Sequence, residues 1–221
     1  MTSKIAQILS VVLHPLLMPT YIFLTLFYVA PETIQNLETL NSSAGVHFGE
    51  RVYISIKDGL LMLIFMYTFL IPVLVIYYFY KFGWIQNLEL KTLQDRRLPY
   101  LASVIIYTFA TVFFALKIRQ LPEIALILGS ITFSIGVVAV ISLYWQISAH
   151  AVGISGMLGA LGGLILKFGP IPLFEPFLLA LLLSGYLCAA RLQLNAHTPV
   201  QIVAGFVLGL LVSLTTVVLW V

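Results

Sequence analysis

The chain has 221 residues, of which 61% are hydrophobic and 9% are charged, and its formal net charge is +3. Soluble globular domains carry about 25% charged residues, so the composition excludes a water-soluble domain and indicates an integral membrane protein. The 11 Lys and Arg residues are scattered between apolar runs, which excludes the continuous basic face of a nucleic-acid-binding protein. No polar tract is long enough for a second domain, so we expect a single membrane domain over residues 1–221.

Seven apolar runs have the length of membrane-spanning helices, which is about 17–25 residues. In chain order, we predict spans at residues 5–30, 59–80, 100–116, 122–145, 150–168, 176–190 and 199–221. The hydrocarbon core cannot hydrogen-bond backbone groups, and the runs lack the alternation of barrel strands, so each is expected to be a helix. The predicted fold class is all-α, a polytopic transmembrane helix bundle of six or seven spans, because the sixth run is short.

Proline and glycine mark local features of the predicted spans. Pro15 and Pro72 are each expected to open the hydrogen-bond ladder of a helix, because proline has no backbone N–H. The connection at residues 31–58 contains turn-forming residues, and we expect a turn or loop there. Gly159 and Gly163 have the spacing that lets two membrane helices approach closely, so tight helix packing is predicted in the fifth span.

Three polar clusters follow the second, fourth and sixth predicted spans, at residues 91–99, 146–150 and 191–201. Two spans separate each cluster from the next, so the crossings place all three clusters on the same membrane face. Arg and Lys bind tetrahedral oxyanions through charge-assisted hydrogen bonds. Histidine can serve phosphoryl transfer as a nucleophile or as a proton donor. The clusters therefore predict a phosphate site with the residues Lys91, Arg96, Arg97, Ser148, His150, Arg191 and His197.

The order of these motifs resembles the type 2 phosphatidic acid phosphatase superfamily of membrane lipid phosphatases. The matching pattern is Lys91 with arginine and Pro99, then Ser-Ala-His at 148–150, then Arg-x5-His at 191–197. The resemblance covers residues 91–221 as a family-like core, and the spans within residues 1–81 lie outside it. It implies that His197 is the nucleophile that becomes phosphorylated and that His150 is the general acid. The phosphate-binding residues that it implies are Lys91, Arg96 or Arg97, Ser148, Ala149 and Arg191.

The chain departs from the family pattern at several positions. Leu98 stands where the family has arginine, and Arg97 comes one place early. Ala149 replaces glycine in the second motif. Gln201 stands where the family has the aspartate that orients the nucleophilic histidine. Replacing such a carboxylate by an amide lowers the rate of a catalytic triad by about 10⁴, so either a slow enzyme or a binding protein is compatible with Gln201.

Three functions remain open. The first is a lipid-phosphate phosphatase or phosphotransferase that needs no metal or other cofactor, because Lys and Arg supply the positive charge. Its expected partners are the lipid bilayer and a lipid phosphate or polyprenyl diphosphate substrate, and the oligomeric state is open. The second is a catalytically impaired lipid-phosphate binder. The third is a lipid transporter, against which stands the absence of an inverted repeat.

The remaining ionisable residues indicate on which side of the membrane the polar clusters lie. Outside the clusters, Lys and Arg lie mostly on the face opposite to the clusters. The positive-inside rule then places the site outside the cytoplasm, although counting the clusters reverses the balance. We expect a bacterial cytoplasmic membrane. Asp95 is expected to pair with a neighbouring arginine, His14 and His47 to be structural, and the predicted anchors at helix ends are Lys57, Lys117, Arg119 and Lys167.

Overall fold

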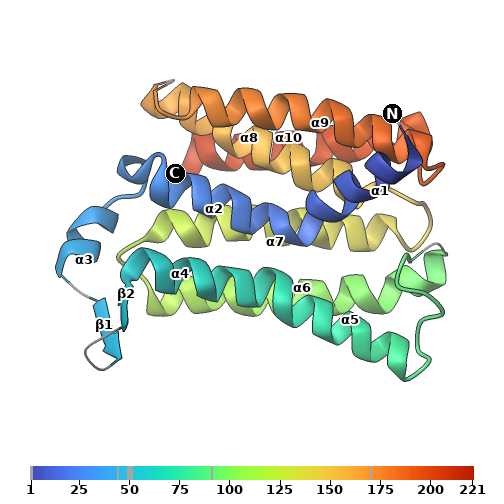
Figure 1. Ribbon diagram of the computed structural model, residues 1–221, viewed down its shortest axis with the longest axis horizontal. Helices are drawn as coiled ribbons and strands as arrows, with labels where there is room; N and C mark the ends of the chain where they lie inside the picture. Colours follow the sequence, from blue (N-terminus) through green and yellow to red (C-terminus); the bar gives the residue numbers. More distant parts are fainter. Residues whose placement is uncertain (1, 44, 49–51, 91, 170) are drawn as a thin grey trace.

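The fold is a bundle of long helices that lie along one axis (Figure 1). The structure is a computed structural model, and it describes residues 2–43, 45–48, 52–90, 92–169 and 171–221. The predicted site residue Lys91 and the side chain of His47 lie outside what it describes. Within the described ranges, seven helical segments are long and apolar enough to cross a membrane. The predicted all-α bundle of membrane-spanning helices is confirmed.

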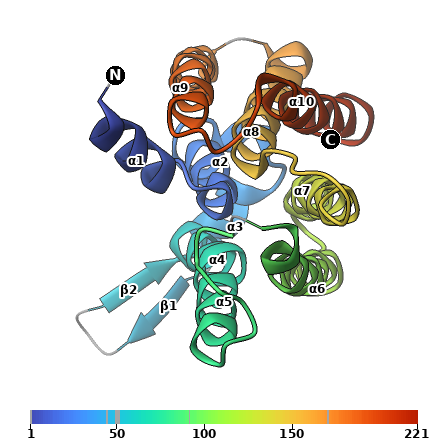
Figure 2. The same ribbon diagram turned by 90° about the vertical axis from the view of Figure 1, so that its right-hand side faces the viewer.

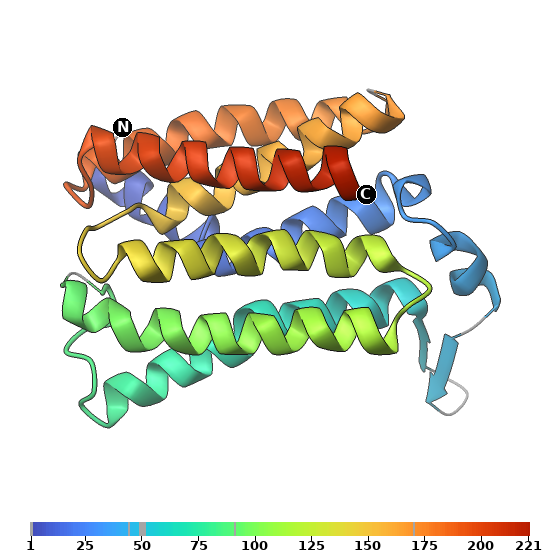
Figure 3. The ribbon, with the colours of Figure 1, turned by 180° about the vertical axis from the view of Figure 1, so that it is seen from behind.

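The seven spans match the predicted runs closely. The first two spans are interrupted. The first consists of α1 (Ser3–Val12), the 3₁₀ turn η1 (Pro15–Leu17) and α2 (Met18–Tyr28). The second consists of α4 (Ile56–Phe65), the π-helical turn η3 (Met66–Leu70) and α5 (Ile71–Lys81). The other five are α6 (Leu93–Lys117), α7 (Pro122–Ile141), α8 (Ala149–Phe168), α9 (Phe174–Gln193) and α10 (Pro199–Trp220). The sixth span has 20 residues and is longer than predicted. Seen from behind, α10, α7 and α6 lie side by side (Figure 3).

The two predicted proline breaks are confirmed. The first span ends α1 at Val12 and resumes with η1, which begins at Pro15. His14 caps this turn, because its Nδ1 accepts a hydrogen bond from the Leu16 backbone N–H at 3.3 Å. In the second span the π-helical turn precedes Pro72, which cannot donate to the carbonyl of Thr68 four residues earlier. The hydroxyl of Tyr107 on α6 donates to that carbonyl at 2.7 Å, so a neighbouring helix repairs the break.

Helix α6 begins at Leu93, seven residues earlier than predicted. Thr92 caps the helix, because its hydroxyl accepts from the Asp95 backbone N–H at 3.1 Å. The Asp95 carboxylate accepts from the Thr92 hydroxyl at 2.7 Å and from the Gln86 backbone N–H at 2.8 Å. The prediction that Asp95 pairs with an arginine is therefore wrong. The cap at Thr92 sets the helix start, although Pro99 lies inside the helix.

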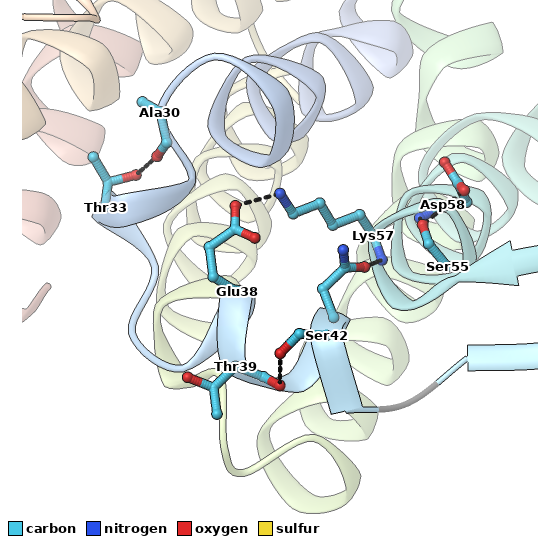
Figure 4. A network of polar contacts seen from close by, with 9 residues as sticks. Ala30, Thr33, Glu38, Thr39, Ser42, Ser55, Lys57 and Asp58 are labelled. Atoms are coloured by element: carbon cyan, nitrogen blue, oxygen red, sulfur yellow. Dashed lines mark hydrogen bonds and ion pairs between the residues drawn. The ribbon is translucent and has the colours of Figure 1, made fainter.

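The described part of the connection between the first two spans forms short helices and strands, so the prediction of a loop is wrong for much of it. It contains η2 (Pro31–Thr33), α3 (Leu37–Ser43) and the antiparallel strands β1 (Gly45–Phe48) and β2 (Val52–Ser55). Polar contacts join α3 to the start of α4 (Figure 4). Lys57 pairs with Glu38 at 2.5 Å, and its backbone N–H donates to the side chain of Asn41 at 3.2 Å. Lys57, predicted to be a membrane anchor, instead holds two helices together.

Helices α8 and α10 pack closely through glycines, as predicted for Gly159 and Gly163. A Cβ atom on Gly159 would lie 2.4 Å from the Leu210 carbonyl oxygen, and one on Gly163 would lie 2.9 Å from Val217. Two glycines of α10 with the same spacing, Gly205 and Gly209, complete the contact, and a Cβ on Gly209 would lie 2.1 Å from a backbone oxygen of α8. This packing brings the start of α8 beside the start of α10 and so joins the second and third polar clusters.

Candidate functional site

A cavity of about 1000 Å³ lies at the end of the bundle where the three clusters emerge. Figure 2 looks onto this end, with the connections that precede α6, α8 and α10 facing the viewer. Helices α1, α5, α6, α7, α8 and α10 contribute to the walls of the cavity. Its charged and imidazole side chains among the described residues are His14, Glu89, Arg96, His150, Arg191 and His197. The fold thus gathers members of all three clusters around one space.

His197 lies between α9 and α10, and 8% of it is exposed. Its Nδ1 donates to the side-chain oxygen of Gln201 at 3.2 Å. The same oxygen accepts from the Thr198 backbone N–H at 3.0 Å, so Gln201 closes a capping box at the start of α10. With the proton on Nδ1, the neutral ring carries its lone pair on Nε2. Gln201 therefore fixes the tautomer that a nucleophilic Nε2 requires.

The surroundings of His197 keep its ring neutral. Burial, together with the positive charge of Arg96, lowers the pKa of His197 from 6.5 to about 4. Arg191 acts in the same direction, whereas hydrogen bonds with Gln201 and with the backbone of Gln146 oppose the shift. The ring is therefore neutral at pH 7, the form in which imidazole can act as a nucleophile.

His150 stands in the first turn of α8 and faces the broken N-terminal span. Its Nε2 donates to the backbone carbonyl of Ser10 at 3.0 Å. The ring of His14 lies edge-on to it, with 5.6 Å between the ring centroids. The interpretation of His14 as a purely structural residue was incomplete, because this side chain both caps η1 and lines the cavity. Neither Ser10 nor His14 belongs to a motif, and only the break at Pro15 pointed to this part of the chain.

Of the two candidate arginines on α6, only Arg96 lines the cavity. It is 7% exposed, and it donates to the carbonyls of Leu90 at 2.8 Å and of Ile147 at 3.4 Å. It thereby links the connections that precede α6 and α8. Arg97 is exposed and is not among the lining residues, because the next position on a helix is turned by about 100°.

Arg191 lies in the last turn of α9 and contacts the N-terminal span. Its Nη1 donates to the hydroxyl of Ser10 at 3.2 Å. Its Nε is buried and has no hydrogen-bond partner among the residues that the structure describes. Leaving a buried donor unsatisfied costs about 1–3 kcal/mol, and more for a charged group. Glu89, the one acidic side chain among the described lining residues, acts on Arg191 electrostatically.

The other predicted phosphate ligands have different placements. Ser148 is fully buried, and its hydroxyl caps α8 by accepting from the Ala151 backbone N–H at 3.4 Å. Ser148 is not among the lining residues, so its hydroxyl is used within the fold. Ala149 lines the cavity in the first turn of α8, where backbone N–H groups have no partner within the helix. This helix start faces the same space as Arg96.

Among the described residues, no group of three or more His, Cys, Asp or Glu side chains is arranged to hold a metal ion. The chain matches no protein-family model, no curated protein and no solved structure. The functional assignment therefore depends on the chemistry of the cavity.

Proposed function

We propose that this membrane protein binds the phosphate group of a lipid phosphate or diphosphate and transfers the phosphoryl group through His197. The observation that carries the proposal is the pairing of two guanidinium groups, that of the buried Arg96 and that of the half-buried Arg191, with a neutral imidazole in one cavity. The motif order that resembles the type 2 phosphatidic acid phosphatases supports the same chemistry. We place the site on the outer side of a bacterial cytoplasmic membrane, following the distribution of Lys and Arg.

The geometry suits a two-step displacement. The Nε2 lone pair of His197 attacks phosphorus, an N–P bond forms, and the bond from phosphorus to the lipid oxygen breaks. Arg96 and Arg191 stabilise the negative charge on the phosphoryl oxygens, which is the main protein contribution in phosphoryl transfer. The leaving oxygen takes a proton from His150. Water then gives a proton to His150 and attacks phosphorus, so the N–P bond breaks, inorganic phosphate leaves and both rings return to their starting forms.

A binding protein without turnover is the second candidate, and two observations favour it. Gln201 orients His197 but brings no negative charge to stabilise the imidazolium form. The Nε2 proton of His150 is already donated to the Ser10 carbonyl, so proton donation to a leaving group requires the ring to break this bond. Both features weaken catalysis and leave the anion-binding groups intact.

Phosphate release from lipids tests the proposal. The protein in nanodiscs is incubated with phosphatidic acid, phosphatidylglycerol phosphate and polyprenyl diphosphate. We expect turnover that His197→Ala lowers at least about 10³-fold, because the nucleophile is lost. Arg97→Ala is the matched control and should retain wild-type turnover, because Arg97 does not line the cavity. Equal activity of the wild type and His197→Ala would refute the histidine mechanism.

The variant Gln201→Asp separates the two candidates. A carboxylate at position 201 accepts the same Nδ1 proton and adds the missing charge, so we expect faster turnover if the chain is a slow enzyme. If neither the wild type nor Gln201→Asp releases phosphate while both bind phosphatidic acid saturably, the chain is a binder. Absence of both turnover and saturable binding would overturn the phosphate site itself.

A further inference from the structure

The cavity extends well beyond the charged groups. On α8 its lining runs from His150 to Ala160, which is ten residues or about 15 Å at the rise of an α-helix. Half of the hydrocarbon core of a bilayer is also about 15 Å thick. On α6 the lining reaches Tyr107, which is only 1% exposed. The cavity is therefore as deep as one leaflet, and buried side chains close it at its inner end.

The deep walls are suited to a hydrocarbon chain. Apolar side chains from three helices, α2, α7 and α8, form most of them, namely Ile22, Ile127, Ile131, Met157 and Ala160. The hydroxyls of Ser103 and Ser134 also line this part, and each donates to a carbonyl one turn earlier, at 2.8 Å and 3.0 Å. Their donors are thus satisfied within their own helices. The charged groups occupy one end and apolar groups the other, which is the polarity of a lipid anion.

The cavity has a side opening toward the bilayer. Val11 on α1 and Tyr77 on α5 both line it, although they are 70% and 48% exposed. Helix α1 packs against α9 at the edge of the bundle and lies apart from α5 in the end view (Figure 2). A residue that both lines a cavity and is exposed marks its mouth. Since both helices belong to membrane spans, this mouth faces lipid rather than water.

We infer that the cavity takes a phosphate-bearing lipid sideways from the bilayer, between α1 and α5, and encloses one hydrocarbon chain as far as Tyr107. The phosphate lies at Arg96 and Arg191, so the inference rests on the proposed phosphate site. It adds that one hydrocarbon chain of the lipid is enclosed, and it adds a route of access. The N-terminal spans, which lie outside the family-like core, supply the mouth.

Soluble alkyl phosphates test the enclosed chain. Binding of inorganic phosphate and of butyl to hexadecyl phosphate is measured by titration of the full chain held in amphipol. Each methylene that moves from water into the cavity should tighten binding about fourfold, until the chain reaches the depth of Tyr107 and the affinity levels off. Ala160→Phe should move this plateau to shorter chains and leave the affinity for inorganic phosphate unchanged. Equal affinity for all chain lengths would overturn the inference.

A substitution at an exposed position tests the side opening of the cavity without disturbing the core. Val11→Trp should slow the capture of phosphatidic acid in nanodiscs roughly tenfold, which corresponds to about 1.4 kcal/mol on the barrier to passage. Val12→Trp is the matched control, because Val12 is 49% exposed on the same helix and does not line the cavity. Equal slowing by both variants, or by neither, would overturn the side opening.

These experiments measure binding, so they separate this inference from the catalytic proposal. Chain-dependent binding without His197-dependent turnover would remove the enzyme and keep the enclosed lipid. Turnover with no dependence on chain length would keep the enzyme and remove the enclosed lipid.

Discussion

The two ends of the bundle treat their charged groups differently. At the end that carries α3 and the hairpin, Lys57 pairs with Glu38, and the Asp58 carboxylate accepts from the hydroxyls of Tyr28 and Ser55. Each of these charges has a partner from the same part of the chain (Figure 4). They hold the connection between the first two spans in place and leave little electrostatic attraction for an external ligand.

At the cavity end, the positive groups are held by neutral acceptors. Arg96 donates to two backbone carbonyls, and Arg191 donates to the hydroxyl of Ser10. Glu89 is the one acidic side chain among the described lining residues, and it acts on Arg191 electrostatically. Neutral acceptors orient a guanidinium group without cancelling its charge. The comparison indicates that the paired charges of Lys57, Glu38 and Asp58 are structural, whereas the arginines of the cavity are available to an anion.

The largest effect on lipid binding is expected from removing a cavity arginine. Arg191→Ala should weaken the binding of phosphatidic acid by about 10- to 150-fold, which corresponds to the 1.5–3 kcal/mol of hydrogen bonds to charged groups. Arg97→Ala should change the affinity little, because its exposed charge is screened by solvent. Binding is measured by titration in nanodiscs. A similar loss in both variants would mean that net charge, rather than the placement of Arg191, governs binding.

An intermediate effect is expected from pH. The pKa of folded His197 is about 4 and lies below its ordinary value of 6.5, so the unfolded chain binds more protons between these two values. The contribution of His197 to stability is therefore complete above pH 6.5 and is lost as the pH falls toward 4. Thermal unfolding of the wild type at pH 7, 5.5 and 4.5 should show a falling Tm. His197→Asn should make this fall smaller, and an unchanged pH profile would contradict the neutral buried ring.

The smallest effect is expected at the opposite end. Glu38→Gln removes an ion pair in which Glu38 is 58% exposed, so stability should fall by less than about 1 kcal/mol. The affinity for phosphatidic acid should stay at the wild-type value. Both quantities are obtained from thermal unfolding and lipid titration of the same preparation. Altered lipid affinity in this variant would show that the two ends are coupled.

Much of the architecture was predictable because the bilayer imposes it. The seven spans followed from the length of helix that crosses hydrocarbon. Pro15 and Pro72 marked the two breaks, and Gly159 with Gly163 marked a close helix contact. The parity of the crossings also predicted that the polar clusters meet at one end, where residues from each of the three clusters line one cavity.

Other features depended on helix rotation and capping. The cap at Thr92 starts α6 seven residues before the predicted start. The rotation of this helix about its axis places Arg96 among the residues that line the cavity and leaves Arg97 outside them. The same cap engages Asp95, which was predicted to pair with an arginine. Lys91 lies outside the described residues, and its predicted role stays a prediction.

Local sequence was enough to predict the apolar runs that span the membrane, the breaks in the first two of them and the end of the bundle at which the polar clusters emerge. Only the tertiary structure placed Ser10 beside His150 and Arg191, which are 140 and 181 positions away along the chain. The physical reason is that the surrounding lipid sets the length and the polarity of each span, so each span can be recognised from its own residues. Which side chains face one another depends on how each helix is rotated against its neighbours, and that rotation is set by packing between distant segments.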